Sequence, residues 1–195
     1  LIDNALPELE KRAIPAMLFI PTGSLGKKPG WITNAKNRNI DETVMSASQV
    51  RSIWSRLVRI GSHGVTHRDL TRLTREEAMQ ELRDSREHLE ELLGERVGSF
   101  AFPFGRYDKS VLDLAGRAGY GKVFCSWPQY PPYKAGGFLL GRVDTSPDDW
   151  DLEFRLKIMG AYRWLPVGIR FKRYVYGLFK VNEPAMPRYS REIRN

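Results

Sequence analysis

Cysteine is nearly absent from this sequence, which excludes a disulfide framework. Cys125 is the only cysteine among 195 residues. It lies in an apolar stretch, where burial without a cationic neighbour keeps a thiol unreactive, so we interpret it as a packed strand residue rather than a nucleophile. No run of about 18 apolar residues occurs, so no segment is a candidate for crossing a membrane. Histidine is also rare, with His63, His67 and His88 as its three positions.

Length and composition favour one domain. With 195 residues, 42% of them hydrophobic, the chain can bury one sizeable core, and no Pro/Gly/Ser-rich linker divides it. We therefore predict a single domain over residues 1–195, in which residues 161–195 form a basic, aromatic C-terminal segment. That segment fits either a membrane interface or a terminal helix packed on the domain, and the second is slightly favoured.

The formal net charge of +8 favours anionic partners such as phospholipid headgroups or acidic glycans, although a solvated basic surface explains it equally well. No nucleic-acid-binding motif accompanies the charge, so we predict no nucleic-acid partner. Peripheral contact with an anionic membrane surface stays open. No secretory signal is in view, and the location stays open between the cytoplasm and the periphery of the cell envelope.

Apolar periodicity predicts alternating strands and helices, which argues for parallel strands covered by helices. The predicted strands are Ala16–Ile20, Leu57–Ile60, Ser99–Phe102, Lys122–Cys125 and Phe138–Arg142. Two of the predicted helices are Asp3–Arg12 and Asp108–Ala118. A third is capped by Ser48 and carries Val50, Ile53, Trp54 and Leu57 on one face. A fourth begins at the capping box Thr74/Glu77 and ends at Gly94. The long polar loop Ser24–Met45 is predicted to rim a cleft.

Two histidines follow the strand that begins at Leu57. Gly61, Ser62 and Gly64 allow a sharp exit from this strand, and His63 and His67 stand four positions apart. If the segment between them takes a helical turn, both rings can direct a nitrogen at one metal ion. The alternative is two polar loop histidines that bind no metal. His88 lies between acidic neighbours at helical spacing, and we interpret it as a surface residue.

A second feature follows the strand that begins at Ser99. Pro103 and Gly105 force a turn that can hold the Phe104 backbone N–H towards a cleft, where it would donate to a developing oxyanion. The alternative is a routine strand exit packed by aromatic rings. Because the ends of parallel strands meet at one rim, we expect His63, His67 and Phe104 to share a cleft, with Arg142 following a later strand.

The segment Ile60–Leu73 closely resembles the metal-binding motif of the polysaccharide deacetylases, a carbohydrate esterase family. Phe100–Asp108 resembles that family's next motif, and Ala5–Leu9 with Ile14–Gly23 is similar to the segment joining its first two motifs. The resemblance spans roughly residues 1–145. It implies a distorted (β/α) barrel whose first strand is missing from this chain. It also implies a divalent metal, zinc by preference, on His63 and His67, and an oxyanion donor at Phe104.

The chain departs from the family pattern at several positions. The Asp-Asp-Gly motif, which supplies a base and a third metal ligand, has no counterpart, because Asp3 lies beyond its position. Ala101 stands where many members carry Arg. No His follows His88, so the late histidine that acts as general acid is absent. Asp149–Trp150 fits either the family's fourth motif or, more simply, a helix that Asp149 caps.

The function predicted from these features is a metal-dependent hydrolase that removes acetyl groups from an acetylated polysaccharide or oligosaccharide, with the bacterial cell envelope as its expected setting. The chain as given is expected to be incomplete and weakly active or inactive. Arg142 is predicted as a catalytic residue, and Pro103, Phe104, Gly105 and Trp150 as substrate contacts. The main alternative is a catalytically inactive carbohydrate-binding or scaffold protein with the same fold. A binder of anionic polymers is a third hypothesis, which rests on charge alone.

Overall fold

The computed structural model of the chain describes residues 2–33, 40–55, 57–126, 137–146 and 148–164. These belong to two compact units, which are described separately below. The first unit comprises Leu1–Cys125 and Phe138–Leu140, and the second comprises Ser126–Gly137 and Gly141–Asn195. A single domain over residues 1–195 stays a prediction, and most of the basic C-terminal segment lies outside the described residues.

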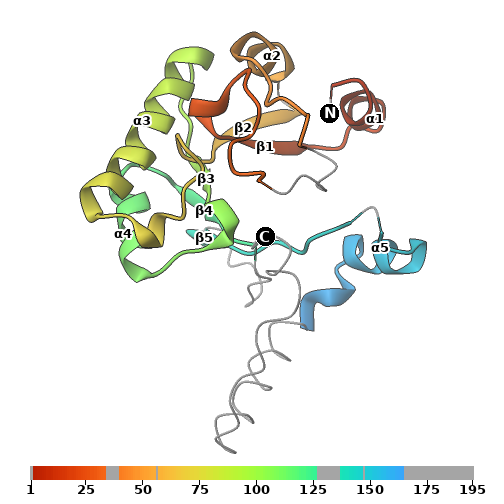
Figure 1. Cartoon of the computed structure of the whole chain (residues 1–195). Coiled ribbons are helices and arrows are strands. Elements are labelled where there is room, and N and C mark those ends of the chain that lie inside the picture. Colours follow the sequence, from red (N-terminus) through yellow and green to blue (C-terminus); the bar gives the residue numbers. More distant parts are fainter. Residues whose placement is uncertain (1, 34–39, 56, 127–136, 147, 165–195) are drawn as a thin grey trace, which may run out of the picture. The chain divides into compact units, whose positions relative to one another are not determined.

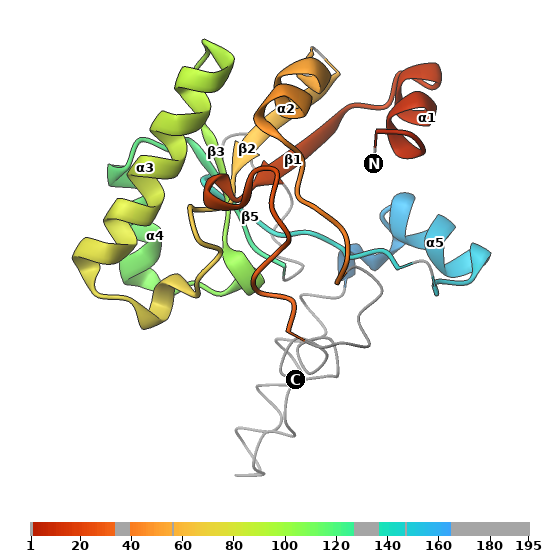
Figure 2. The ribbon, with the colours of Figure 1, turned by 45° about the horizontal axis from the view of Figure 1, so that its top comes forward.

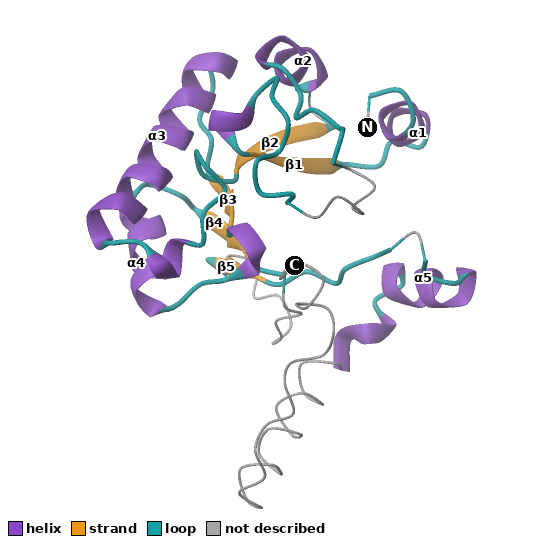
Figure 3. Cartoon of the chain, in the orientation of Figure 1, coloured by secondary structure: helices purple, strands orange, loops and turns teal. Residues whose placement is uncertain are grey.

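The first unit is built on a parallel sheet with the strand order β1-β2-β3-β4-β5, which confirms the predicted α/β fold (Figure 1, Figure 3). Its strands are β1 (Ala16–Ile20), β2 (Val58–Ser62), β3 (Ser99–Ala101), β4 (Lys122–Phe124) and β5 (Leu139–Leu140). Its helices are α1 (Ala5–Lys11), α2 (Ala47–Ile53), α3 (Arg75–Leu93) and α4 (Lys109–Arg117). In the second unit, α5 (Asp151–Ile158) is followed by a 3₁₀ turn, Ala161–Trp164.

The hydrophobic core lies between the sheet and the helices α2, α3 and α4, of which α3 and α4 run side by side (Figure 1, Figure 2). One cluster joins α3 and α4 to β3 and β4 through Leu82, Phe100, Phe102, Leu114 and Val123. A second joins α2 and α3 to β1 and β2 through Ile20, Val50, Val58, Ile60 and Leu89. Cys125 follows β4 directly and is fully buried, as predicted for a packed residue.

The other face of the sheet is concave. Neighbouring strands lie about 4.8 Å apart, so β1 and β4 would be separated by roughly 14 Å in a flat sheet. The rings of Phe19 on β1 and Phe124 on β4 nevertheless meet, with centroids 5.1 Å apart. Gly61 on β2 accommodates this contact, because a Cβ there would lie 2.6 Å from the Phe19 ring. The described strands therefore form a strongly curved sheet, as in a barrel that is open on one side.

Local capping signals account for the starts of α2, α3 and α4 and for the end of α3. Thr74 and Glu77 form the predicted capping box of α3, which ends at Gly94 with a left-handed φ of 69°. Asp108 caps α4 through the Val111 N–H at 2.8 Å. The prediction of Ser48 as a cap is wrong, since Ser46 caps α2 and Gln49 completes its capping box.

Several element boundaries differ from the predictions by one or two residues, and two strands and one helix cap differ for identifiable reasons. Strand β2 continues to Ser62, two residues beyond the predicted end, because pairing with β1 extends to that position. The last strand is shorter than predicted and is confined to Leu139–Leu140. In the second unit, Asp149 does not cap α5, because its carboxylate instead pairs with Lys157 at 2.7 Å and accepts from the Ser146 N–H.

No helix in the described part of the chain is both long and apolar enough to cross a membrane. The longest, α3, has 19 residues and carries charged side chains along its exposed face.

Candidate metal-binding site

The loop that carries the two histidines continues directly from β2. Its backbone pairs with the turn after β1, since the His63 N–H donates to the Ile20 carbonyl at 3.0 Å and the Gly23 N–H donates to the Val65 carbonyl at 2.9 Å. Gly23 permits this close approach, because a Cβ at that position would lie 2.7 Å from the Val65 oxygen. The carboxyl ends of β1 and β2 therefore fix where the loop begins.

The backbone between the histidines does not form the helical turn on which the sequence-based expectation was conditional. Gly64 has a φ of 80°, and His67 itself has a φ of 59°. The Glu81 carboxylate, which extends from α3, accepts hydrogen bonds from the N–H groups of Val65 and Thr66 at 2.7 and 3.0 Å. These non-helical dihedrals and a contact from a distant helix bring the two rings together.

The imidazole rings of His63 and His67 have centroids 4.7 Å apart and planes at 75°. A centroid lies about 3 Å from a metal bound to its ring nitrogen, so two rings on one tetrahedral ion have centroids about 5 Å apart. His63 Nδ1 lies 2.7 Å from the Ala101 carbonyl oxygen, which can only accept, so this nitrogen carries the proton and Nε2 the lone pair. The pair therefore fits a metal with imidazole ligands.

His67 is enclosed by aromatic rings. Trp31 stacks on it with centroids 4.1 Å apart, Phe104 meets it edge-on at 4.8 Å, and the residue is only 9% exposed. Its Nδ1 is buried and has no hydrogen-bond partner among the described residues. Burial, followed by the proximity of His63, lowers the pKa of His67 to about 4. His67 is therefore held neutral, the protonation state in which an imidazole binds metal.

The turn after β3 brings Phe104 to the histidines. Pro103 and Gly105 are buried, Phe104 has a left-handed φ of 57°, and the Gly105 N–H donates to the Phe102 carbonyl at 2.9 Å. Two of the three non-glycine residues with positive φ in the described chain, His67 and Phe104, thus lie in contact. Such backbone strain concentrates at functional sites, where the surrounding structure enforces it.

An ion pair connects the histidine loop to the Phe104 turn. Arg106 donates to the Asp69 carboxylate at 2.7 Å, and its guanidinium lies 5.8 Å from the centre of the Phe104 ring. Burial opposes ionisation of Asp69, but hydrogen bonds from Arg106 and Thr71 outweigh it and leave the pKa of Asp69 below its ordinary value. This ion pair therefore joins the histidine loop to the Phe104 turn, in addition to the ring contact between His67 and Phe104.

The remaining predicted site residues, Arg142 and Trp150, belong to the second unit. Arg142 is exposed, and Trp150 is 66% exposed at the start of α5. Their proposed roles stay predictions. No group of three or more His, Cys, Asp or Glu side chains suited to a metal occurs within the described ranges, so the two histidines would form an incomplete ligand shell there.

Sequence reasoning missed Glu81 and Trp31. A signal for Glu81 was present, because it falls on the same face of α3 as Ala78, Leu82, Ser85 and Leu89, where an acidic residue is out of place. Trp31 lies in the long loop after β1, which has no periodicity that would indicate its contacts. The prediction that this loop rims a cleft stays a prediction, although Trp31 stacks on His67.

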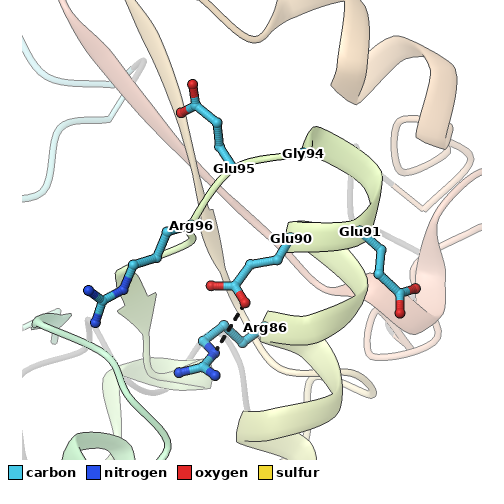
Figure 4. A pocket seen from close by; sticks show the side chains of 6 residues that line it. All are labelled: Arg86, Glu90, Glu91, Gly94, Glu95 and Arg96. Atoms are coloured by element: carbon cyan, nitrogen blue, oxygen red, sulfur yellow. Dashed lines mark ion pairs between the residues drawn. The ribbon is translucent and has the colours of Figure 1, made fainter.

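A surface hollow of about 700 Å³ lies away from these residues, around the C-terminal end of α3 (Figure 4). Its lining consists of Arg86, Glu90, Glu91, Gly94, Glu95 and Arg96. Arg86 pairs with Glu90 at 3.7 Å and donates to the Ala118 carbonyl at the end of α4. These residues adjoin the amino ends of β3 and β4, whereas the histidines follow the carboxyl end of β2.

Comparisons with known proteins agree with the fold. The sequence profile of the family described as polysaccharide deacetylase matches residues 1–123. YxkH of Bacillus subtilis strain 168, which is named as a candidate polysaccharide deacetylase, is 24% identical over 145 residues, covering 74% of this chain and 47% of YxkH. The chain thus spans about half the length of this relative.

Two solved structures share the fold. The Streptococcus pyogenes deacetylase PplD, in complex with acetate, superposes with a TM-score of 0.65 at 20% identity, covering 80% of this chain and 63% of PplD. BC0361, a polysaccharide deacetylase from Bacillus cereus, superposes with a TM-score of 0.64 at 22% identity, covering 80% of this chain and 46% of BC0361. The chain belongs to the polysaccharide deacetylase family, a family of carbohydrate esterases.

The enclosure of His67 leads to a pH prediction for the metal-free chain. We expect His67 to titrate near pH 4 rather than at the ordinary value of 6.5. Because burial disfavours the charged imidazole, protonation of His67 favours the unfolded chain. The free energy of unfolding is therefore highest above pH 6.5 and falls as the pH drops towards 4, by about 3 kcal/mol in total. NMR titration of the imidazole signals measures this pKa directly.

The control for this titration separates burial by Trp31 from other effects. Trp31→Ala opens one face of the His67 ring to water, so the pKa of His67 should rise towards 6.5. Trp150→Ala, at an exposed position in the second unit, should leave it near 4. A Trp31→Ala variant in which His67 still titrates near 4 would contradict the assignment of this burial to the Trp31 ring.

Proposed function

We propose that this chain is the metal-holding part of a hydrolase that removes acetyl groups from an acetylated polysaccharide or oligosaccharide. The observation that carries the proposal is the convergence of His63, His67 and the Phe104 turn in a chain of the polysaccharide deacetylase family. Zinc is the proposed metal, because two imidazoles at this separation match its preferred ligands and geometry.

The proposed chemistry assigns each residue a role. When bound, the metal supplies a Lewis acid for the acetyl carbonyl and a water whose pKa is lowered from about 15.7 towards about 7. His63 binds through Nε2, because its Nδ1–H donates to the Ala101 carbonyl. The backbone N–H of Phe104, in the turn held by Pro103 and Gly105, donates to the oxyanion that develops on the acetyl carbonyl.

Other roles are proposed from the family resemblance. Arg142 is assigned to catalysis and Trp150 to a sugar contact, with Pro103, Phe104 and Gly105 lining the acetyl group. In the family pattern the general base and the third metal ligand belong to an Asp-Asp-Gly motif, which does not occur among the 195 residues. Peripheral contact with an anionic membrane surface is retained as a proposal that rests on the net charge of +8.

A binding experiment tests the proposal without requiring turnover. The ¹⁵N-labelled chain is titrated with an acetylated chito-oligosaccharide, with and without zinc, and the same oligomer after removal of its acetyl groups is the control. We expect the Phe104 amide signal to shift with the acetylated oligomer when zinc is present, and His67→Ala to abolish the shift. Equal shifts with both oligomers, independent of zinc, would instead support a carbohydrate-binding protein without catalysis.

A further inference from the structure

We propose that Glu81 is a positioning residue of the metal site, which holds the backbone between the two histidines so that both rings face one ion. The inference rests on the proposed metal site and adds a residue with no direct role in ligation. Glu81 lies on α3, whereas both histidines lie in the loop after β2.

The contacts of Glu81 are concentrated on the centre of the loop. One carboxylate oxygen, Oε2, accepts from the Val65 N–H at 2.7 Å and from the Thr66 N–H at 3.0 Å. The other oxygen, Oε1, accepts from the Thr66 hydroxyl. Glu81 is only 8% exposed, so these hydrogen bonds form largely out of water, where unsatisfied partners would be costly. One side chain thus satisfies three donors between the two candidate ligands.

The loop depends on these hydrogen bonds because it has no regular backbone structure that would determine its shape. No helical turn links His63 to His67, and both Gly64 and His67 have positive φ. The fit around the carboxylate is close, since a Cβ on Gly64 would lie 3.0 Å from Glu81 Oε2. Without an acceptor at this place, the Val65 and Thr66 N–H groups would turn towards water, and the direction of the His67 ring would change with them.

The hydrogen-bonding pattern suggests which substitutions separate positioning from packing. In Glu81→Gln, the amide oxygen can accept from both N–H groups while the amide nitrogen donates to the Thr66 hydroxyl, so the geometry is retained. In Glu81→Met, the side chain has similar length but no oxygen acceptor. Glu87→Met makes the same chemical change at an exposed position on α3 and is the matched control.

The first measurement is the zinc affinity of the chain by isothermal titration calorimetry. Outer-shell partners typically contribute about 10–100-fold to metal affinity, so we expect a loss of that size in Glu81→Met. Glu81→Gln should stay within about 3-fold of the unmodified chain, because its hydrogen bonds are retained. Glu87→Met should bind as the unmodified chain does. The order of zinc affinities among the three variants distinguishes the effect of losing the acceptor oxygens from the effect of any other mutation on α3.

A second measurement needs no metal. Trp31 stacks on His67, so its fluorescence reports the position of that ring, and subtraction of a Trp31→Phe background isolates its emission from that of the other four tryptophans. In the metal-free chain, Glu81→Met should change the Trp31 emission, whereas Glu81→Gln and Glu87→Met should not. A residue that only stabilised α3 would lower the thermal unfolding temperature without this selective change.

The outcomes separate this inference from the proposed function. If His67→Ala leaves zinc binding intact, the metal site itself is wrong. If His67→Ala abolishes binding but folded Glu81→Met keeps full affinity and unchanged Trp31 emission, only the role of Glu81 is overturned. Should Glu81→Met not fold, Thr66→Val removes one of the three hydrogen bonds and should lower zinc affinity to a smaller extent. Unchanged affinity in Thr66→Val would then overturn the inference.

Discussion

Replacing His67 by Ala is expected to lower the zinc affinity of this chain by at least about 100-fold, beyond the 10–100-fold typical of outer-shell losses. The reason is that the proposed site has two imidazole ligands within the described residues, and removal of one leaves a single nitrogen donor that holds a metal only weakly. His63→Ala should have an effect of the same order. Isothermal titration with zinc measures both.

The matched control is His88→Ala, which removes the third histidine of the chain from an exposed position on α3. It should leave the affinity unchanged. Zinc binding that survives His63→Ala and His67→Ala but is lost in His88→Ala would refute the proposed site. A metal-soaked crystal structure with the two rings pointing away from each other would do the same.

Much of the fold could be predicted because its signals are local. The bounds of β1 follow from a short apolar run that ends at Pro21, and the structure has the same bounds, Ala16–Ile20. The start and end of α3 follow from the Thr74/Glu77 capping box and Gly94, each of which acts within one helical turn. Where two similar signals compete, as with Ser46 and Ser48, the side chain three residues later decides, and Gln49 selects Ser46.

The candidate site could be predicted only in part, because its geometry depends on residues far apart in the chain. The spacing of His63 and His67 predicted that their rings could face one ion, but the contacts that shape the loop include Glu81, which lies in a different element. The orientation of His63 likewise depends on a carbonyl at Ala101, 38 residues away. Every residue has a backbone carbonyl, so the residue types of a sequence do not show which carbonyl accepts such a hydrogen bond.

The contacts of Ala101 change the interpretation of its departure from the family pattern. Ala101 stands where many members of the family carry Arg, which the sequence alone marks as a departure. In the structure, the carbonyl of this residue accepts the His63 Nδ1–H at 2.7 Å, a contact that any residue except one with a distorted backbone can make. The orientation of His63 therefore does not depend on which side chain stands at position 101.

The second large effect concerns catalysis. The proposed site has two metal ligands and an oxyanion donor at Phe104, but the sequence contains no Asp-Asp-Gly and no histidine after His88. General acid and base groups typically contribute about 10²–10⁴-fold each, so we expect this chain alone to release acetate at or near background. Adding a strand that ends in Asp-Asp-Gly before Leu1 should raise the rate by about 10²–10⁴-fold, because it supplies a base and a third ligand.

The assay is acetate release from acetylated chito-, xylo- or glucosamine oligomers with added zinc. It compares the chain, the extended chain and the extended His63→Ala variant, with an extension ending in Asn-Asn-Gly as the matched control. The metal-hydrolase proposal requires that only the extended chain with intact His63 be active, since the base acts on water held at the imidazole pair. Equal rates in all four proteins would contradict it. Activity of the extended chain without a late histidine would mean that solvent serves as the general acid, because no other histidine follows His88.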